Sequence, residues 1–138
     1  MSESERTLEV ARAFYDAFNG WDFGVLQDVL AEDIVFELPY SPFPSEKRTE
    51  GRDKTIAMLR IVKNVLSGLR LYDINVDTLA ADPATFVAEF RSSATISSTG
   101  VSYGNRYIAR GTVRDGQVVD YAEFFDPLVL RAALAGAS

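Results

Sequence analysis

The pattern of apolar and polar residues predicts three helices in the first half of the chain. An amphipathic helix is expected from about Ser4 to Asn19, and Gly20 ends it. A shorter helix follows, with Asp22 as its N-cap. A third begins at Arg52, and Gly68 is predicted to stop it. The three apolar faces consist of Val10, Ala11, Phe14, Tyr15, Ala17 and Phe18, of Val25, Leu26, Val29 and Leu30, and of Ile56, Leu59, Val62, Val65 and Leu66.

A strand, "DIVFEL", and a long loop separate the second and third helices. The loop runs from Pro39 to Gly51, because its three prolines lack the N–H groups that regular pairing needs. Loops of this length are often functional. Its aromatic residues, Tyr40 and Phe43, either form the rim or lid of a pocket or pin the loop to the core.

The second half of the chain alternates as strands do. Tyr72, Ile74 and Val76 alternate with polar residues, and further strands are predicted at about 84–97, 101–113 and 117–125. The turns between them, "ADPA", "SSTG" and "RDG", suit tight hairpins, so we expect an antiparallel meander. Asp126 and Pro127 have the residue types of an N-cap and first helical position, which predicts a short C-terminal helix.

These elements predict an α+β fold in one domain, residues 1–138. The sheet must cover its apolar face with the three N-terminal helices, and helices lying across a curved antiparallel sheet leave a cone. Such a cone holds one small apolar ligand among its lining side chains.

Composition and charge narrow the possible partners. The chain has 138 residues, of which 47% are hydrophobic, enough for a single core. The net charge of −6 leaves no basic face for nucleic acid. No apolar run approaches the roughly 20 residues that cross a bilayer, and the N-terminal segment is too acidic for a secretory signal, so we expect a cytoplasmic protein without membrane contact.

The chain contains neither histidine nor cysteine. A zinc, iron or copper site is therefore not expected, and neither are Ser-His-Asp or Cys-His nucleophiles. Any catalysis would use carboxylates, phenols or cations, without a metal or organic cofactor.

Three segments carry a family resemblance: "RAFYDAFNGWDFGVLQDVLAEDIVFE", "EGRDKTIAML" and "VRDGQVVDYAEFFDPLVLRAAL". They resemble the cone-shaped α+β fold shared by ketosteroid isomerase, the SnoaL-like polyketide cyclases and limonene epoxide hydrolase, the nuclear transport factor 2-like superfamily. The resemblance covers nearly the whole chain and implies the fold. The fold hosts isomerases, cyclases, hydrolases and proteins without catalysis, so it does not select a reaction.

Within this superfamily, "ADPATFVAEF" and "GVSYGNRY" are most similar to the phenazine biosynthesis A and B proteins. That resemblance implies an acid or base glutamate on the last strand, which falls on Glu123. The partner histidine of those proteins falls on Met58.

The other family templates match less well. The tyrosine, base and protonated aspartate of ketosteroid isomerase fall on Phe14, Leu38 and Ala109, with Tyr15 one residue from the tyrosine. Glu123 matches the last carboxylate of limonene epoxide hydrolase, but its Arg-x-Asp strand signature is absent.

Alternation on the last strand places Val119, Tyr121, Glu123 and Phe125 on one face. On this interpretation Glu123 is buried among aromatic residues, where desolvation raises a carboxyl pKa toward neutrality. The alternative is a surface glutamate paired with Arg106 or Arg110 on the neighbouring strand. Glu37, by its own alternation, is expected to face outward.

Several aromatic and polar residues are candidates for binding. Tyr103, Asn105 and Tyr107 alternate on one face and line either the cavity or a dimer interface. Phe14, Tyr15 and Phe18 are expected to form core and pocket wall. The candidate substrate-binding residues are Phe14, Tyr15, Phe18, Leu38, Tyr40, Met58, Asn105, Tyr107 and Tyr121.

The leading hypothesis is a small-molecule isomerase or cyclase that uses Glu123 for general acid–base catalysis on a cyclic, mostly apolar ketone or related secondary-metabolite intermediate. One alternative is a non-catalytic module that binds a small apolar or aromatic ligand in the same cone. Another is an epoxide-hydrolase-like activity. The resemblance also implies a homodimer through the open face of the sheet.

Overall fold

A computed structural model describes residues 1–136, which form four α-helices, one 3-10 turn and six strands. The helices are α1 (Glu3–Gly20), α2 (Phe23–Val29), α3 (Arg52–Val65) and α4 (Pro127–Leu134), and the 3-10 turn is η1 (Pro44–Glu46). The strands are β1 (Leu30–Glu37), β2 (Arg48–Glu50), β3 (Leu66–Leu79), β4 (Asp82–Ile96), β5 (Ser102–Arg114) and β6 (Gln117–Phe124).

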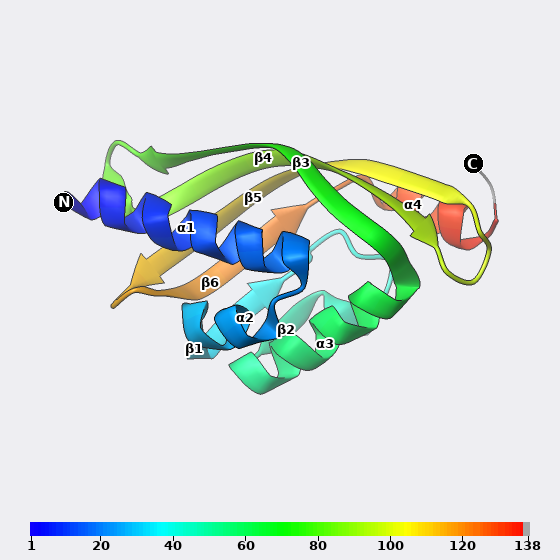
Figure 1. Cartoon of the computed structure of the whole chain (residues 1–138), viewed down its shortest axis with the longest axis horizontal. Coiled ribbons are helices and arrows are strands. Elements are labelled where there is room, and N and C mark those ends of the chain that lie inside the picture. Colours follow the sequence, from blue (N-terminus) through cyan, green and yellow to red (C-terminus); the bar gives the residue numbers. More distant parts are fainter. Residues whose placement is uncertain (137–138) are drawn as a thin grey trace.

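The strands form one sheet in the order β2-β1-β6-β5-β4-β3. Neighbouring strands are antiparallel except β1 and β6, which run parallel. Figure 1 shows α1, α2 and α3 on one side of the sheet, beneath the arch of the long strands. The sheet is curved and does not close on itself, so the predicted α+β cone with three N-terminal helices and a short C-terminal helix is confirmed.

Irregular pairing helps to bend the sheet. The register of β3 against β4 shifts between Ser67 and Arg70 and again between Tyr72 and Asn75. Gly68 and Asp73, one in each irregular stretch, have positive φ angles of 64° and 52°. Bulges of this kind increase local twist and bend a strand, and β3 accordingly curves around the helices (Figure 1).

The helix starts follow the capping residues in the sequence. Ser2 and Glu5 form a capping box, so α1 begins one residue earlier than expected. Asp22 caps α2 by accepting a hydrogen bond from the Val25 N–H at 3.1 Å, as predicted. Asp126 likewise caps α4, accepting from Leu128 N–H at 2.9 Å.

Two helix boundaries were predicted wrongly. Helix α3 ends at Val65, and β3 begins at Leu66 without a connecting turn, so Gly68 lies in a strand instead of stopping the helix. Leu30, assigned to the apolar face of the second helix, is the first residue of β1. At each boundary an apolar residue, Leu30 or Leu66, packs in the core or against it although the backbone there is already extended. A pattern of apolar positions does not show where the backbone changes from helical to extended.

The segment Pro39–Gly51, predicted as an irregular loop, contains η1 and the short strand β2. Its last part pairs with β1, with Phe36 opposite Thr49 and Glu37 opposite Arg48. All three prolines precede β2, so their missing N–H groups do not interrupt the pairing.

A bulge in β6 changes its predicted alternation. Asp120 pairs with Thr112, but Val118 pairs with Val113, so Val119 is an extra residue. Val118 is consequently buried on the same side as Tyr121 and Glu123, although strict alternation placed it on the opposite face.

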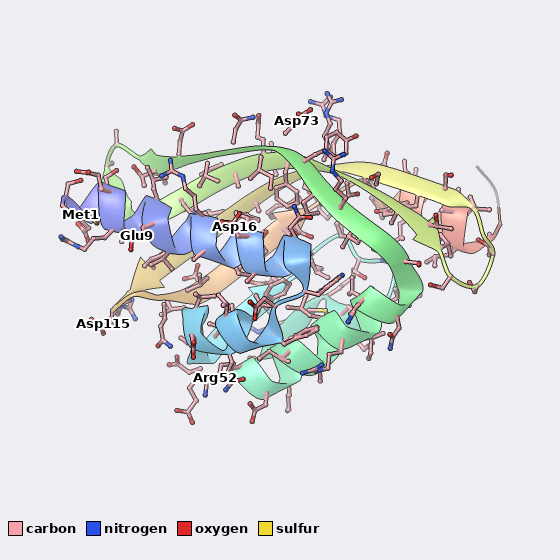
Figure 2. The ribbon with its side chains drawn as sticks, in the orientation of Figure 1. Met1, Glu9, Asp16, Arg52, Asp73 and Asp115 are labelled. Carbon is pink, nitrogen blue, oxygen red and sulfur yellow. The ribbon has the colours of Figure 1, made fainter. Side chains whose placement is uncertain are left out.

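The main core lies between the helices and the concave face of the sheet, and a smaller cluster beneath α4 contains Ile96, Tyr103 and Ala133. Charged side chains such as Glu9, Asp16 and Asp115 lie on the outside (Figure 2). Among the described residues, no helix is long and apolar enough to cross a membrane.

Candidate active site

Two side chains of β6 and one of α1 form a buried hydrogen-bonded chain. The Tyr121 hydroxyl donates to Glu123 Oε1 at 2.9 Å, and the Tyr15 and Tyr121 hydroxyl oxygens are 3.0 Å apart. Because the single hydroxyl hydrogen of Tyr121 is used on Glu123, Tyr15 is the donor to Tyr121. The chain of donors therefore runs from Tyr15 through Tyr121 to the carboxylate.

Glu123 is 8% exposed and is surrounded mainly by apolar and aromatic side chains. Burial raises its pKa from an ordinary value of 4.5 to about 7, although the hydrogen bond from Tyr121 acts in the opposite direction. A carboxyl group with this pKa exchanges protons readily near neutral pH. The interpretation of Glu123 as a surface residue paired with Arg106 or Arg110 is wrong, since both arginines are exposed and the carboxyl group is bonded to Tyr121.

A second group of polar side chains lies nearby on β4 and β5. The Tyr107 hydroxyl oxygen is 2.8 Å from Ser92 Oγ and 3.4 Å from the Tyr103 hydroxyl oxygen. Asn105 Nδ2 donates to the Tyr103 oxygen at 2.8 Å, which leaves the hydroxyl hydrogen of Tyr103 free for another acceptor.

The phenols of these groups stay protonated at neutral pH. Burial raises the pKa of Tyr15, Tyr103, Tyr107 and Tyr121, and the negative charge of Glu123 raises each of them further. All four are therefore hydrogen-bond donors and not bases, so among the buried residues described Glu123 is the group suited to accept a proton.

A small, partly open cavity of about 80 Å³ is lined in part by Glu123. Oε2 of Glu123 has no hydrogen-bond partner among residues 1–136. Every fully enclosed polar side-chain atom of these residues does have a hydrogen-bond partner, so Oε2 is not fully enclosed. Because Glu123 lines the cavity, this oxygen is accessible from it. The lining residues are Phe18, Phe36, Leu38, Glu46, Met58, Leu59, Val62, Leu66, Tyr103, Tyr107, Glu123, Phe125 and Leu130.

Five of the residues proposed from the sequence line this cavity together: Phe18, Leu38, Met58, Tyr107 and Glu123. Phe14, Tyr15 and Tyr121 are buried behind it, packed on one another with ring centroids 5.0–6.3 Å apart. These three shape and support the site without lining the cavity.

Asn105 and Tyr40 have other positions. The Asn105 amide donates to Tyr103 and to the Asp126 carbonyl oxygen at 3.0 Å, and its Oδ1 accepts from the Asp126 N–H, so it joins β5 to the start of α4. Tyr40 packs on Phe124, with ring centroids 5.3 Å apart, across the sheet from the cavity. It is therefore not on the rim of the cavity that contains Glu123.

Eight of the lining residues were absent from the candidate set, and two of these eight, Glu46 and Tyr103, are polar. Tyr103 shares its alternation with Tyr107, which was a usable signal. Glu46 lies in η1, on the proline-containing segment, where no periodicity indicates the direction of a side chain. Ser41 Oγ donates to Glu46 Oε2 at 3.2 Å.

A second hollow of about 330 Å³, here called the mouth groove, lies beside the cavity. It shares Glu46, Val62, Leu66 and Leu130 with the cavity wall. Its remaining lining residues are Phe43, Ser45, Ile61, Val65 and Leu134.

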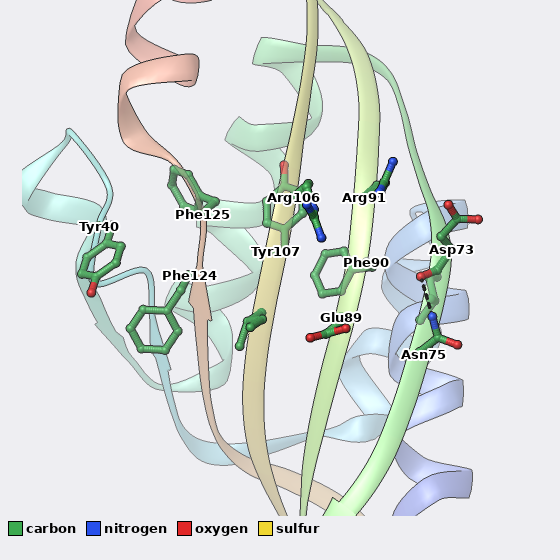
Figure 3. A pocket seen from close by; sticks show the side chains of 12 residues that line it. Tyr40, Asp73, Asn75, Glu89, Phe90, Arg91, Arg106, Tyr107, Phe124 and Phe125 are labelled. Carbon is green, nitrogen blue, oxygen red and sulfur yellow. Dashed lines mark hydrogen bonds between the residues drawn. The ribbon is translucent and has the colours of Figure 1, made fainter.

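A third hollow, of about 690 Å³, lies on the other side of the sheet and is called the outer hollow (Figure 3). Figure 3 shows Tyr40 and Phe124 at one end, Asp73 and Asn75 at the other, and Arg106 between them. It is the larger space, but its carboxylates, Asp73 and Glu89, are exposed. The buried carboxyl group of Glu123 borders the small cavity instead.

Comparison with known proteins identifies the family. A SnoaL-like domain model matches residues 11–121. The chain belongs to the SnoaL-like family. The uncharacterised protein YesE of Bacillus subtilis is 32% identical over 138 residues, covering 99% of this chain and 92% of YesE. An uncharacterised PhzA/B-like protein of Pseudomonas aeruginosa is 31% identical over 109 residues, covering 79% and 76% of the two chains.

A solved structure agrees with the fold. A Bacillus subtilis protein provisionally described as an isomerase superposes with a TM-score of 0.87 at 30% identity, covering 99% of this chain and 98% of the other. The predicted relationship to the SnoaL-like and phenazine A/B-type proteins is thus confirmed. Among the described residues, no cluster of three or more Asp or Glu side chains is placed to hold a metal ion.

Proposed function

We propose that this SnoaL-like protein moves a proton on a small cyclic, mostly apolar ketone, as an isomerase or cyclase, with Glu123 as the general base and acid. The observation that carries the proposal is the Glu123 carboxyl group, which is buried, borders the cavity with one oxygen and has a pKa raised to about 7. Strongly shifted carboxyl groups in cavities are typical of proton-transfer sites.

The mechanism begins with removal of a proton from the carbon next to the substrate carbonyl. Glu123 Oε2 accepts that proton, and the electron pair of the C–H bond moves onto the carbonyl oxygen as an enolate. Tyr103 and Tyr107 present hydroxyl donors on the cavity wall, and their hydrogen bonds strengthen as the oxygen becomes negative. Tyr121 holds Oε1 and so directs Oε2 toward the substrate.

The second half of the reaction returns the proton from Glu123. Return to a different carbon gives an isomer, and attack of the enolate carbon on a second carbonyl of the same substrate gives a ring. In the cyclisation, the protonated Glu123 supplies the proton for the new hydroxyl group. Neither route requires a metal or an organic cofactor, because Glu123 and the phenols supply both the base and the donors.

Hydrogen–deuterium exchange tests the first step without knowledge of the natural product. Simple cyclic ketones in D₂O would be followed by NMR for exchange at the carbon next to the carbonyl. Wild-type protein is expected to accelerate exchange, and Glu123→Gln to lose about 10²- to 10⁴-fold of that acceleration while remaining folded. A Glu123→Gln variant with wild-type exchange would refute the proposal.

A non-catalytic binding function is the second candidate, and the replacement of the phenazine-type histidine by Met58 favours it. It predicts that wild-type protein binds cyclic ketones but leaves their exchange rate unchanged. The epoxide-hydrolase alternative has less support, because the Asn105 amide that could orient a water is engaged by Tyr103 and Asp126.

We further propose a homodimer through the outer hollow. Ile108 and Phe124 give this surface an apolar part, while Arg91, Arg106 and Glu89 carry charges of both signs. Two copies related by a two-fold axis could place arginine against glutamate across the interface.

A further inference from the structure

The cavity at Glu123 is too small for the substrate that the proposed chemistry needs. Ligand pockets usually have volumes of about 300–1,000 Å³, whereas this cavity has about 80 Å³. The reacting end of a ring fits near Glu123 only if the rest of the molecule extends out of the cavity. The mouth groove, which shares part of the cavity wall, is the adjoining space.

The mouth groove has apolar walls that face solvent. Phe43 and Ile61 are 43% and 57% exposed and line the groove together with Leu130 and Leu134 of α4. Figure 1 shows α4 and the C-terminal end of α3 at the same end of the molecule. A contiguous apolar surface of this kind, open to solvent and continuous with a cavity, is typical of a ligand site.

Glu46 lies where the groove meets the cavity and borders both. Ser41 orients it: Ser41 Oγ accepts from the Phe43 N–H at 3.1 Å and donates to Glu46 Oε2 at 3.2 Å. The ion pairs within residues 1–136 are those of Arg48 with Glu37 and Glu50, so no described cation neutralises Glu46. A half-buried carboxylate between apolar walls is best satisfied by a ligand that donates a hydrogen bond.

We propose that the substrate is a cyclic ketone with an apolar arm and a hydroxyl group at the start of that arm. The ring lies in the cavity at Glu123, the arm lies in the mouth groove, and Glu46 accepts the hydrogen bond of the hydroxyl group. This inference rests on the proposed function for the position of the ketone. It adds Glu46 as the residue that selects the substrate.

The test measures the affinities of cyclohexanone, its 2-propyl and 2-pentyl derivatives and the 2-(1-hydroxypentyl) derivative by calorimetry. Affinity is expected to rise about fourfold for each methylene of the arm that becomes buried. The hydroxyl group should add about tenfold or more, because the acceptor is charged. Equal affinities along the alkyl series would overturn the arm site.

Three variants locate the effect. Ile61→Glu should remove the gain from the arm, and Glu46→Gln should reduce the gain from the hydroxyl group by about tenfold while keeping the gain from the arm. Val25→Glu is the matched control, since Val25 is an exposed apolar residue that borders neither hollow. If Val25→Glu lowers affinity as much as Ile61→Glu does, binding is nonspecific and the proposal fails.

The two proposals fail separately. If binding depends on arm length and on Ile61 but no exchange depends on Glu123, the mouth groove is supported as a binding site and the acid–base role of Glu123 is refuted. If exchange depends on Glu123 but all ketones of the series bind equally well, the acid–base role of Glu123 is supported and the mouth groove is refuted as a substrate site.

Discussion

Tyr121 and Glu123 lie two residues apart on β6 and are joined by a hydrogen bond of 2.9 Å that points along the strand. Side chains at this spacing share a face, so one short segment supplies both the carboxyl group and the donor that fixes one of its oxygens. Tyr15 of α1 completes the chain. Tyr15 therefore helps to order the Glu123 carboxyl group although it does not itself line the cavity.

Replacing Tyr121 by phenylalanine should move the pH profile of exchange toward alkaline pH. The Tyr121 hydrogen bond stabilises the ionised carboxylate and lowers the Glu123 pKa, so its loss should raise that pKa above about 7. The active base would then form only at higher pH. Rates measured from pH 5 to 10 should show a higher midpoint in Tyr121→Phe, while an unchanged midpoint would mean that Tyr121 does not act on the base.

The donors for the enolate can be tested by Tyr103→Phe and Tyr107→Phe. Each should lower kcat by roughly a hundredfold with little change in KM, because the hydrogen bond strengthens only as negative charge develops. Tyr40→Phe is the matched control, since Tyr40 lies on the other side of the sheet. A change in KM alone would make the two tyrosines binding residues and not donors to the enolate.

The sequence predicted the four helices, every strand except β2 and the fold, because hydrophobic period and capping residues are local signals. It was less informative where structure depends on pairing. The extra residue at Val119 turns Val118 inward, and it is recognisable only against the partner strand.

The candidate site shows the same division. Alternation was enough to group Tyr103 with Tyr107 and Tyr121 with Glu123. The contribution of Glu46 to the cavity wall depends on the path of the Pro39–Gly51 segment, which has no repeating pattern. Tyr40 and Glu46 belong to the same segment, but Tyr40 borders the outer hollow and Glu46 borders the cavity at Glu123. Their residue types alone did not predict this difference.

Gly111 should not tolerate a side chain. A Cβ atom there would lie 2.5 Å from Phe86 Cζ and 3.1 Å from the Asp120 carbonyl oxygen. Phe86 is fully buried and cannot move aside freely, so Gly111→Ala should lower the free energy of unfolding by ~1–3 kcal/mol. Gly20→Ala is the control, because a Cβ atom there has nothing within 4 Å. Urea denaturation that gives equal stabilities for both variants would contradict this close packing.

Ile108→Glu should dissociate the proposed dimer. Ile108 is exposed in the outer hollow, and a glutamate there would bury an unpaired charge in the interface. Sedimentation velocity should give a dimer for the wild type and a monomer for Ile108→Glu, whereas Val25→Glu should remain dimeric. A monomeric wild type at high micromolar concentration would exclude this assembly.

Glu123→Gln should make the protein more stable at alkaline pH while removing activity. The carboxyl group has an ordinary pKa of 4.5 and a folded-state pKa of about 7. Below pH 4.5 it is protonated in both states and costs nothing; between pH 4.5 and 7 the unfolded state releases the proton first, so stability falls as pH rises. Above pH 7 the loss of stability levels off at roughly 3 kcal/mol.

Chemical denaturation at pH 4 and pH 8 should show a gain in stability for Glu123→Gln only at pH 8. Glu89→Gln, at an exposed position, should show none, and a gain that is equal at both pH values would mean that the charge of Glu123 is not the cause.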